Sequence, residues 1–245
     1  MPDAADPLTP KTYVLVHGAW HGGWCWRDVA DLLRARGHRV FAPTLTGLGE
    51  RRHHLSRDIS LSTFVADVMG VMEAEELEDI VLVGHSHGGA VISGVADLMP
   101  ERIRALVYLD ATILQNGESA FGVLPAEVVE ERRHKVAETG GLAMPVPDVT
   151  AFGIPADHPR AGWVRRRLTP HPVGSYESPL ALAHPVGNGR ACTYISCTDP
   201  LYLPLQPARD WARAQPGWSW REIATGHDAM VLAPEALVGL LEEAG

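Results

Sequence analysis

The stretch DIVLVGHSHGGAV (79–91) places one serine, Ser86, among glycines and histidines directly after an apolar run. Its centre, GHSHG (84–88), matches G-x-S-x-G between a predicted strand and a predicted helix, the context that gives this pattern its meaning. A serine on such a tight turn needs a sparsely populated backbone conformation, and the glycines leave room for it. We expect Ser86 to be a nucleophile. The alternative is a glycine-rich turn that caps a helix and has no chemistry.

Short β-branched runs alternate with helical patterns on both sides of this turn. The runs in 12–18 and 103–110 are continuously apolar, which is typical of strands buried on both faces of a parallel sheet. The alternation predicts an α/β fold with a doubly wound, mostly parallel sheet. The predicted strands are 12–18, 38–43, 79–84, 103–110, 192–196 and 218–224, and the predicted helices are 26–37, 62–77, 89–99, 207–214 and 234–244.

The alternation stops between about 112 and 187. This segment holds nine of the 19 prolines and one clear amphipathic stretch, 126–138. We expect an inserted, mainly helical cap at 112–187, an α/β core made of 12–111 and 188–245, and an N-terminal extension at 1–11. The alternative for the insertion is a poorly ordered linker.

A serine hydroxyl needs a base, and the base needs a third group to orient it. In the chain order of this turn type, serine is followed by the acid and then by histidine. His227 is the single histidine after residue 190, and it follows a predicted strand. We expect Asp199, which also follows a strand, to be the acid, with Asp110 as its rival. Asp210 and Asp228 are weaker candidates, because one lies in a predicted helix and the other adjoins the base.

Acyl transfer also needs amide donors for the oxyanion. One donor is expected to be the backbone N–H of His87, the residue after the nucleophile. The second should come from the first strand–helix loop, HGAWHGGW (17–24), where Ala19 is best placed. These amides complete a site for a tetrahedral intermediate.

Composition excludes several other classes of protein. The formal net charge is −9, so there is no basic surface for nucleic acid. No signal-peptide pattern and no apolar run of about 18 residues is present, which predicts a cytoplasmic protein without a membrane partner. The three cysteines lack a metal or disulfide spacing, and the adjacent histidines in 50–58 fit a solvated loop. We expect no metal, no cofactor and a small-molecule ester as partner; a homodimer stays open.

Five segments together resemble the plant hydroxynitrile lyase and methylesterase family and its bacterial esterase relatives, a branch of the α/β-hydrolase superfamily. They are YVLVHGAWHGGWCW, GHSHGG, LVYLDA, TDPLYLP and GHDAM. The resemblance extends from about residue 12 to 240 and is weakest over the insertion. It implies a catalytic triad of Ser86, Asp199 and His227, oxyanion amides from Ala19 and His87, and a pocket role for His21.

Two departures from the lyases favour a hydrolase. The lyases carry threonine where this chain has Gly18, and lysine, which holds cyanide, where it has Asp228. A negative charge at that position would oppose a developing cyanide. The expected function is therefore a carboxylesterase that forms an acyl-enzyme. The alternatives are an amide, carbamate or lactone hydrolase with the same triad, a hydroxynitrile lyase, and a small-molecule receptor on the same fold.

Substrate contacts are expected from the first loop and the cap. Apolar cap side chains over a polar triad would form an acyl or alcohol pocket; the alternative is a small satellite core. The candidate pocket residues are Gly18, Trp20, His21, Phe121 and Trp163, with Leu124 and Phe152 as further cap candidates.

Overall fold

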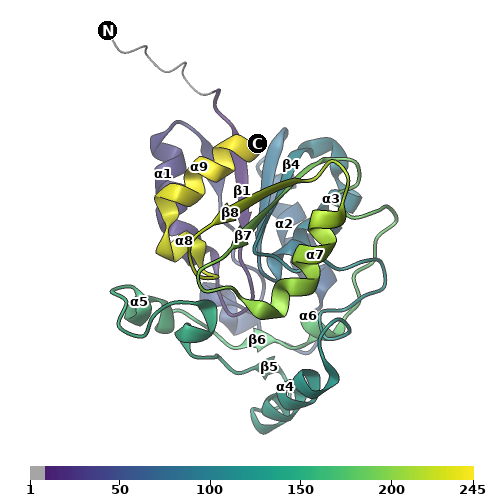
Figure 1. Cartoon of the computed structure of the whole chain (residues 1–245). Coiled ribbons are helices and arrows are strands. Elements are labelled where there is room, and N and C mark those ends of the chain that lie inside the picture. Colours follow the sequence, from purple (N-terminus) through teal and green to yellow (C-terminus); the bar gives the residue numbers. More distant parts are fainter. Residues whose placement is uncertain (1–8) are drawn as a thin grey trace.

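A computed structural model describes residues 9–245 of the chain, and Figure 1 shows its α/β architecture. Six parallel strands form one sheet in the order β2-β1-β3-β4-β7-β8, which confirms the predicted doubly wound fold. The strands are β1 (Thr12–Val16), β2 (Arg39–Phe41), β3 (Ile80–His85), β4 (Ile103–Leu109), β7 (Ala191–Cys197) and β8 (Ser219–Ile223). β1, β3 and β4 are almost wholly buried, as their continuous apolar runs predict.

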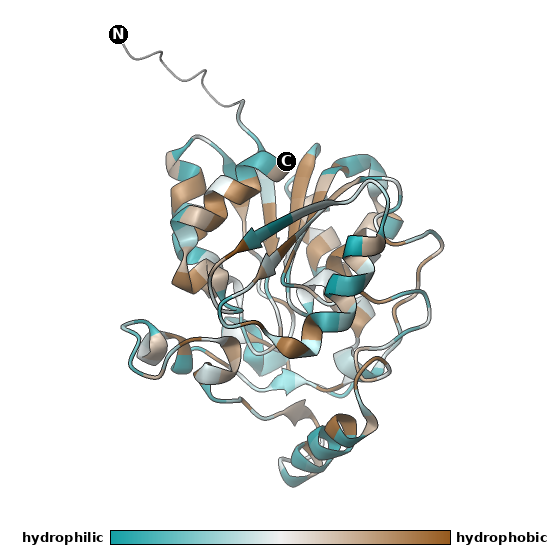
Figure 2. Ribbon diagram, viewed as in Figure 1, coloured by the Kyte–Doolittle hydropathy of each residue, from teal (hydrophilic) through white to brown (hydrophobic). Residues whose placement is uncertain are grey.

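Helices cover both faces of the sheet (Figure 1). Helices α1, α8 and α9 pack on one face against strand residues such as Leu15 and Val83. Helices α2, α3 and α7 pack on the other, against the alternate residues such as Val14 and Leu82. Their bounds are α1 (Arg27–Ala35), α2 (Leu61–Ala74), α3 (Gly88–Leu98), α7 (Gln206–Ala214), α8 (Ala229–Leu232) and α9 (Pro234–Ala244). Figure 2 shows the result as a brown, apolar centre with teal outer helix faces.

Most of the chain between β4 and β7 lies beyond the carboxyl ends of the strands, and its last part returns beside α3 to the start of β7 (Figure 1). It contains α4 (Ala126–Glu138), α5 (Ala161–Arg165) and α6 (Gly174–Glu177), and α4 has the predicted bounds. It also holds an antiparallel pair of short strands, β5 (Ala143–Met144) and β6 (His171–Pro172), which the sequence pattern did not predict. The remainder is irregular apart from 3-10 turns such as η4 (Val149–Phe152). The division into core and cap at 112 and 187 stays a prediction, and residues 1–8 of the expected N-terminal extension lie outside the described residues.

The sheet order explains where chemistry can gather. From β1 the chain first adds β2 on one side and then places β3 and β4 on the other, so the order reverses between β1 and β3. In open α/β sheets, ligands bind at the carboxyl edge of such a reversal. The GHSHG turn follows β3 and the HGAWHGGW loop follows β1, so both lie at this point. Within residues 9–245, no helix is both long and apolar enough to cross a membrane.

Candidate active site

Ser86 lies on a strained turn between β3 and α3. Its φ is +53°, in the left-handed region, and a Cβ atom on Gly84 would come within 2.6 Å of the carbonyl oxygen of Gly88. The turn is tied to the neighbouring strand, because the Ser86 N–H donates to the Leu109 carbonyl (3.2 Å) and the Ser86 carbonyl accepts from the Thr112 N–H (2.9 Å). The glycines therefore permit a close backbone approach that exposes the hydroxyl.

His227 and Asp110 form a buried pair beside this turn. The Nδ1–H of His227 donates to Oδ2 of Asp110 over 2.6 Å, and both side chains are almost completely buried. An ionised carboxylate only accepts hydrogen bonds, so the proton of the neutral imidazole is on Nδ1 and Nε2 is left as the acceptor. This is the tautomer that a histidine needs to take a proton from a serine.

The expectation that Asp199 orients His227 is wrong in this structure. Asp199 lies two residues beyond the end of β7, in an exposed turn. Its backbone N–H donates to the carbonyl oxygen of Thr225. Asp110, the rival candidate, directly follows β4 and its N–H still donates to the β7 residue Ile195 (2.7 Å). Asp110 therefore stays at the buried carboxyl edge of the sheet, whereas β7 continues outward before it reaches Asp199.

A buried arginine completes this group, and sequence reasoning missed it. Arg209, on α7, donates from Nη2 to Oδ1 of Asp110 (2.7 Å) and from Nε to the Ser196 hydroxyl (3.1 Å). Its Nη1 also donates to the Tyr202 carbonyl (2.9 Å). The two oxygens of Asp110 are thus divided between Arg209 and His227, which fixes the orientation of the carboxylate. No local pattern marked Arg209, which lies in an ordinary amphipathic helix.

The amides of Ala19 and His87 are available for an oxyanion. Among residues 9–245, neither N–H has a hydrogen-bond acceptor. The next residue, Trp20, has a φ of +64°; its N–H donates to Nδ1 of His171 (3.2 Å) and its carbonyl accepts from Thr169 (3.0 Å). The segment beside β6 therefore holds the first loop in a strained conformation.

His21 contacts the backbone of this loop and is not among the residues that line the cavity at Ser86. Its Nδ1 faces the Ala19 carbonyl (2.8 Å) and its Nε2 faces the Asp228 carboxylate (3.0 Å). Both ring nitrogens must donate to satisfy these acceptors, so the ring carries a positive charge. Burial alone would lower the pKa of His21, but the Asp228 charge and the two hydrogen bonds together raise it. Asp228 is thus paired inside the protein and does not face the cavity.

Two further histidines beside the serine are neutral. Burial lowers the pKa of His87 to about 3 and also lowers that of His85 well below its usual value. The His85 Nε2–H donates to the carbonyl of His227 (3.0 Å), and the His87 ring stacks on Tyr176 with 4.4 Å between centroids. These contacts give the two side chains supporting roles beside the serine.

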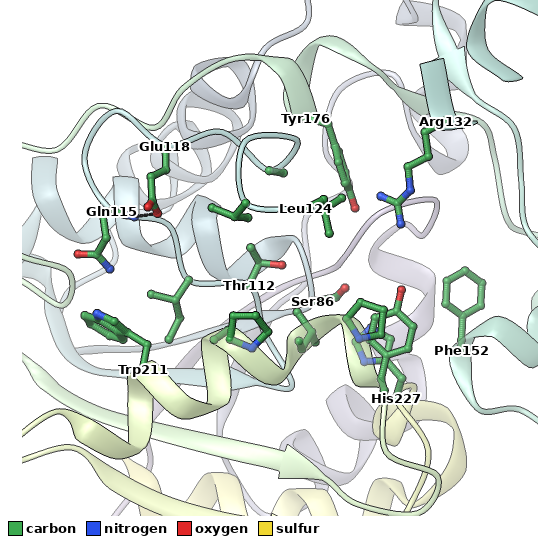
Figure 3. Close-up of a pocket in the computed structure, with 18 of the residues that line it drawn as sticks. Ser86, Thr112, Gln115, Glu118, Leu124, Arg132, Phe152, Tyr176, Trp211 and His227 are labelled. Carbon is green, nitrogen blue, oxygen red and sulfur yellow. Dashed lines mark hydrogen bonds between the residues drawn. The ribbon is translucent and has the colours of Figure 1, made fainter. Parts of the chain in front are cut away.

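A cavity of about 220 Å³ opens over Ser86 and His227 (Figure 3). Its walls come from the turn at Ser86, the insertion and the segment around α7, and most of the lining side chains are apolar. Trp20, Leu124 and Phe152 line it, as expected. The other lining residues are Thr112, Ile113, Gln115, Glu118, Ala120, Val123, Arg132, Tyr176, Tyr202, Pro204, Leu205, Pro207, Ala208 and Trp211. Arg132 and Tyr202 were not singled out in the sequence.

Three of the expected pocket residues lie elsewhere. Phe121 is buried against Tyr176 and borders a separate surface groove. Trp163 packs edge-on against Trp24 and under the guanidinium groups of neighbouring arginines. Gly18 lies directly against Ser86, since a Cβ there would lie 2.7 Å from that of Ser86. Phe121 and Trp163 therefore pack the insertion, and Gly18 allows the first loop to approach the serine.

No group of three or more histidine, cysteine or acidic side chains within residues 9–245 is arranged to hold a metal ion. The adjacent histidines of the 50–58 segment lie in the short 3-10 helix η2 (Gly49–His54) on the surface. The polar groups immediately around the turn are the serine, the histidine–aspartate pair and two open amides. Such an arrangement can perform nucleophilic substitution at an acyl carbonyl.

Comparisons with known proteins agree with this geometry. The profile of the alpha/beta hydrolase family matches residues 13–240. A carbendazim hydrolyzing esterase from Nocardioides sp. is 43% identical, over 95% of this chain and 99% of its own length. A putative chloroplastic methylesterase from Arabidopsis thaliana is 30% identical, over 82% of this chain and 58% of its own length.

The fold has close relatives among solved structures. An extracellular alpha/beta-hydrolase from a Paenibacillus species superposes with a TM-score of 0.81, at 22% identity and with coverage of 96% of this chain and 99% of its own. The family match covers nearly the whole chain, and the methylesterase and bacterial esterase relatives confirm the expected resemblance. The chain therefore belongs to the α/β-hydrolase family.

Proposed function

We propose that this protein is a serine hydrolase that cleaves small to medium carboxylic esters through an acyl-enzyme. The observation that carries the proposal is the buried Asp110–His227 pair on the wall of the same cavity as Ser86. It leaves Nε2 as the free acceptor of a histidine that lines the same cavity as the strained Ser86, and activation of a hydroxyl requires such a base. The esterase relative at 43% identity supports the same reaction class.

The proposed reaction proceeds in two halves. His227 takes the proton of Ser86 as its oxygen attacks the acyl carbonyl, and the amides of Ala19 and His87 donate to the developing oxyanion. The imidazolium then returns the proton to the departing alcohol, and an ester between Ser86 and the acyl group remains. A water molecule deprotonated by His227 attacks this ester, and collapse of the second oxyanion releases the acid and restores the serine.

The runner-up substrates are amides, carbamates and lactones, which the same groups could attack. The relative's name makes carbendazim a specific compound to test. A hydroxynitrile lyase is not favoured, because Asp228 is paired with His21 and the position offers no cation to hold cyanide. A receptor that binds without turnover is separated from an enzyme by kinetics alone.

The test is a substrate panel on purified protein with Ser86→Ala as the blank. The panel contains nitrophenyl esters of increasing acyl length, a matched anilide, a carbamate ester, a lactone and carbendazim. We expect turnover of at least the short esters and none above the blank for Ser86→Ala. Equal rates for wild type and Ser86→Ala would refute the proposal, as would binding of every ester without turnover.

A further inference from the structure

One cation in the catalytic cavity has no counter-charge. Arg132 extends from α4 into the cavity (Figure 3), and no carboxylate within residues 9–245 lies at ion-pair distance from its guanidinium. Its neighbours on the helix are paired: Lys135 with Glu131 (2.6 Å) and Arg133 with Glu177 (3.5 Å). The helix therefore balances its outward cations and leaves the inward one unbalanced.

Arg132 is held in place by aromatic rings. Its Cζ lies 5.7 Å from the centroid of Tyr176. Burial raises the pKa of Tyr176 to about 12 and also raises that of Tyr202, and the Arg132 charge opposes both increases. A guanidinium has five N–H donors, and two phenols cannot satisfy all of them. Because Arg132 lines the cavity, a ligand there can reach donors that the phenols leave unpaired.

Arg132 also marks a junction between two cavities. A second space, of about 330 Å³, lies against the catalytic one and is lined by Met144, Pro145 and Pro147. The two cavities share four lining residues: Trp20, Arg132, Phe152 and Tyr202. The guanidinium is therefore part of the wall that the two cavities share.

The opposite end of the catalytic cavity carries the opposite charge. Glu118 lines it there, and its carboxylate accepts the Gln115 N–H (2.8 Å). Figure 3 shows Glu118, Gln115 and Trp211 on one side of Ser86 and Arg132 with Phe152 on the other. An anionic group is attracted to the Arg132 end and repelled from the Glu118 end, so the charges give a substrate one direction across the serine.

We propose that Arg132 binds a carboxylate carried by the substrate, so that the preferred esters are half-esters with a second, ionised acid group. Bidentate pairing with a guanidinium suits a carboxylate, and the partly buried site strengthens it. Arg132 is then a substrate-positioning residue that selects and orients the ester without taking part in the bond changes.

A matched substrate pair tests this proposal, which rests on the proposed ester hydrolysis for its kinetic part. Mono-4-nitrophenyl glutarate is anionic, and 4-nitrophenyl valerate has the same chain length without the charge. In Arg132→Gln, kcat/KM for the glutarate should fall by about 10- to 100-fold, and for the valerate by far less. Arg133→Gln, the same charge change on the outer face of α4, should leave the ratio of the two substrates unchanged.

Binding separates this proposal from the reaction. Glutarate should bind Ser86→Ala, and the affinity should fall about 10- to 100-fold in Ser86→Ala with Arg132→Gln. If no ester is turned over but this difference persists, the esterase proposal fails and the carboxylate site stands. Equal loss for both esters, or equal glutarate affinity with and without Arg132, overturns the carboxylate site.

A second variant covers the case in which Arg132→Gln does not fold. Arg132→Lys keeps the charge and should keep a preference for the glutarate ester. That preference should shrink when the ionic strength rises from about 0.01 M to about 1 M, because the Debye length falls from about 30 Å to about 3 Å. A preference that is insensitive to salt contradicts an ionic contact.

Discussion

Asp110 Oδ2 lies 2.6 Å from Nδ1 of His227, although 117 residues separate the two in the chain. The parallel pairing of β4 with β7 brings Asp110 to the carboxyl edge of the sheet, and the loop after β8 brings His227 to the same edge. The second oxygen of Asp110 is bound by Arg209. The ring of His227 is thus oriented by a carboxylate whose other oxygen is also bound within the protein.

Replacement of Asp110 by asparagine should cripple the enzyme. The amide can favour the wrong tautomer of His227, and in the best-studied triad the matching change lowers kcat by about 10⁴-fold. Asp199→Asn, at an exposed position, is the matched control and should keep near wild-type kcat. Steady-state kinetics on folded protein, checked by circular dichroism, decides between them. A large loss of kcat in Asp199→Asn, together with a nearly normal kcat in Asp110→Asn, would reverse our assignment.

Arg209 should matter for stability as well as for orientation. Arg209→Met leaves the buried Asp110 carboxylate without its cation, and breaking such a pair costs about 3–5 kcal/mol of unfolding free energy. Arg213→Met, on the same helix, breaks an exposed pair with Glu222 and should cost about 0–1 kcal/mol. Urea unfolding measures both. Equal losses would mean that Arg209 contributes no more than a surface charge.

Acid should destabilise the fold well before its carboxylates are protonated. Burial lowers the pKa of His17 and of His87 from 6.5 to about 3, and it also lowers those of His85 and His171. Below pH 6.5 these histidines bind protons in the unfolded chain but stay neutral in the folded protein. The free energy of unfolding therefore falls as the pH drops toward 3. Each such histidine contributes about 1.4 kcal/mol per pH unit. His21, whose pKa is raised, acts in the opposite direction.

A single substitution isolates one of these protons. His87→Phe can keep the stacking on Tyr176 but cannot titrate. Its unfolding free energy, measured in urea from neutral pH to about pH 5, should fall less steeply than that of wild type, by about 1.4 kcal/mol per pH unit. Identical slopes would show that His87 is not held neutral in the folded state.

The insertion should control substrate choice through only some of its aromatic and aliphatic residues. Leu124→Ala and Phe152→Ala enlarge the cavity over the serine and should shift the ranking of nitrophenyl esters toward longer acyl chains. Phe121→Ala and Trp163→Ala remove packing away from that cavity, so they should lower the melting temperature and leave the ranking unchanged. A ranking altered only by the second pair would place the substrate elsewhere.

Local sequence patterns predicted most of the framework. The bounds of α4 and α9 match the predicted helices residue for residue. A proline marks the start of each: Pro125 precedes α4, and Pro234 begins α9. The turn at Ser86 was equally readable, since its G-x-S-x-G pattern lies between a predicted strand and a predicted helix, and a Cβ on Gly84 would meet the nearby Gly88 carbonyl. Features determined by neighbours in the chain were therefore accessible.

Features determined by long-range geometry were not. Asp110 and Asp199 both follow strands of seven residues. The register that pairs Leu109 with Ile195 lets β7 run further past the carboxyl edge, so Asp199 lies further out than Asp110. Arg132 looks like one more charge on a polar helix, and its place in the cavity depends on how α4 docks over the sheet. His171, which bonds the Trp20 N–H, lies 151 residues away from it in the chain.

Covalent labelling tests the central claim, that Ser86 is the nucleophile, most directly. Wild-type protein is treated with a serine-directed fluorophosphonate and its intact mass is measured, followed by peptide mapping. We predict loss of esterase activity in step with the gain of one adduct, located on Ser86, and no adduct on Ser86→Ala. Labelling of another residue while activity persists, or an equal adduct on Ser86→Ala, would contradict the account.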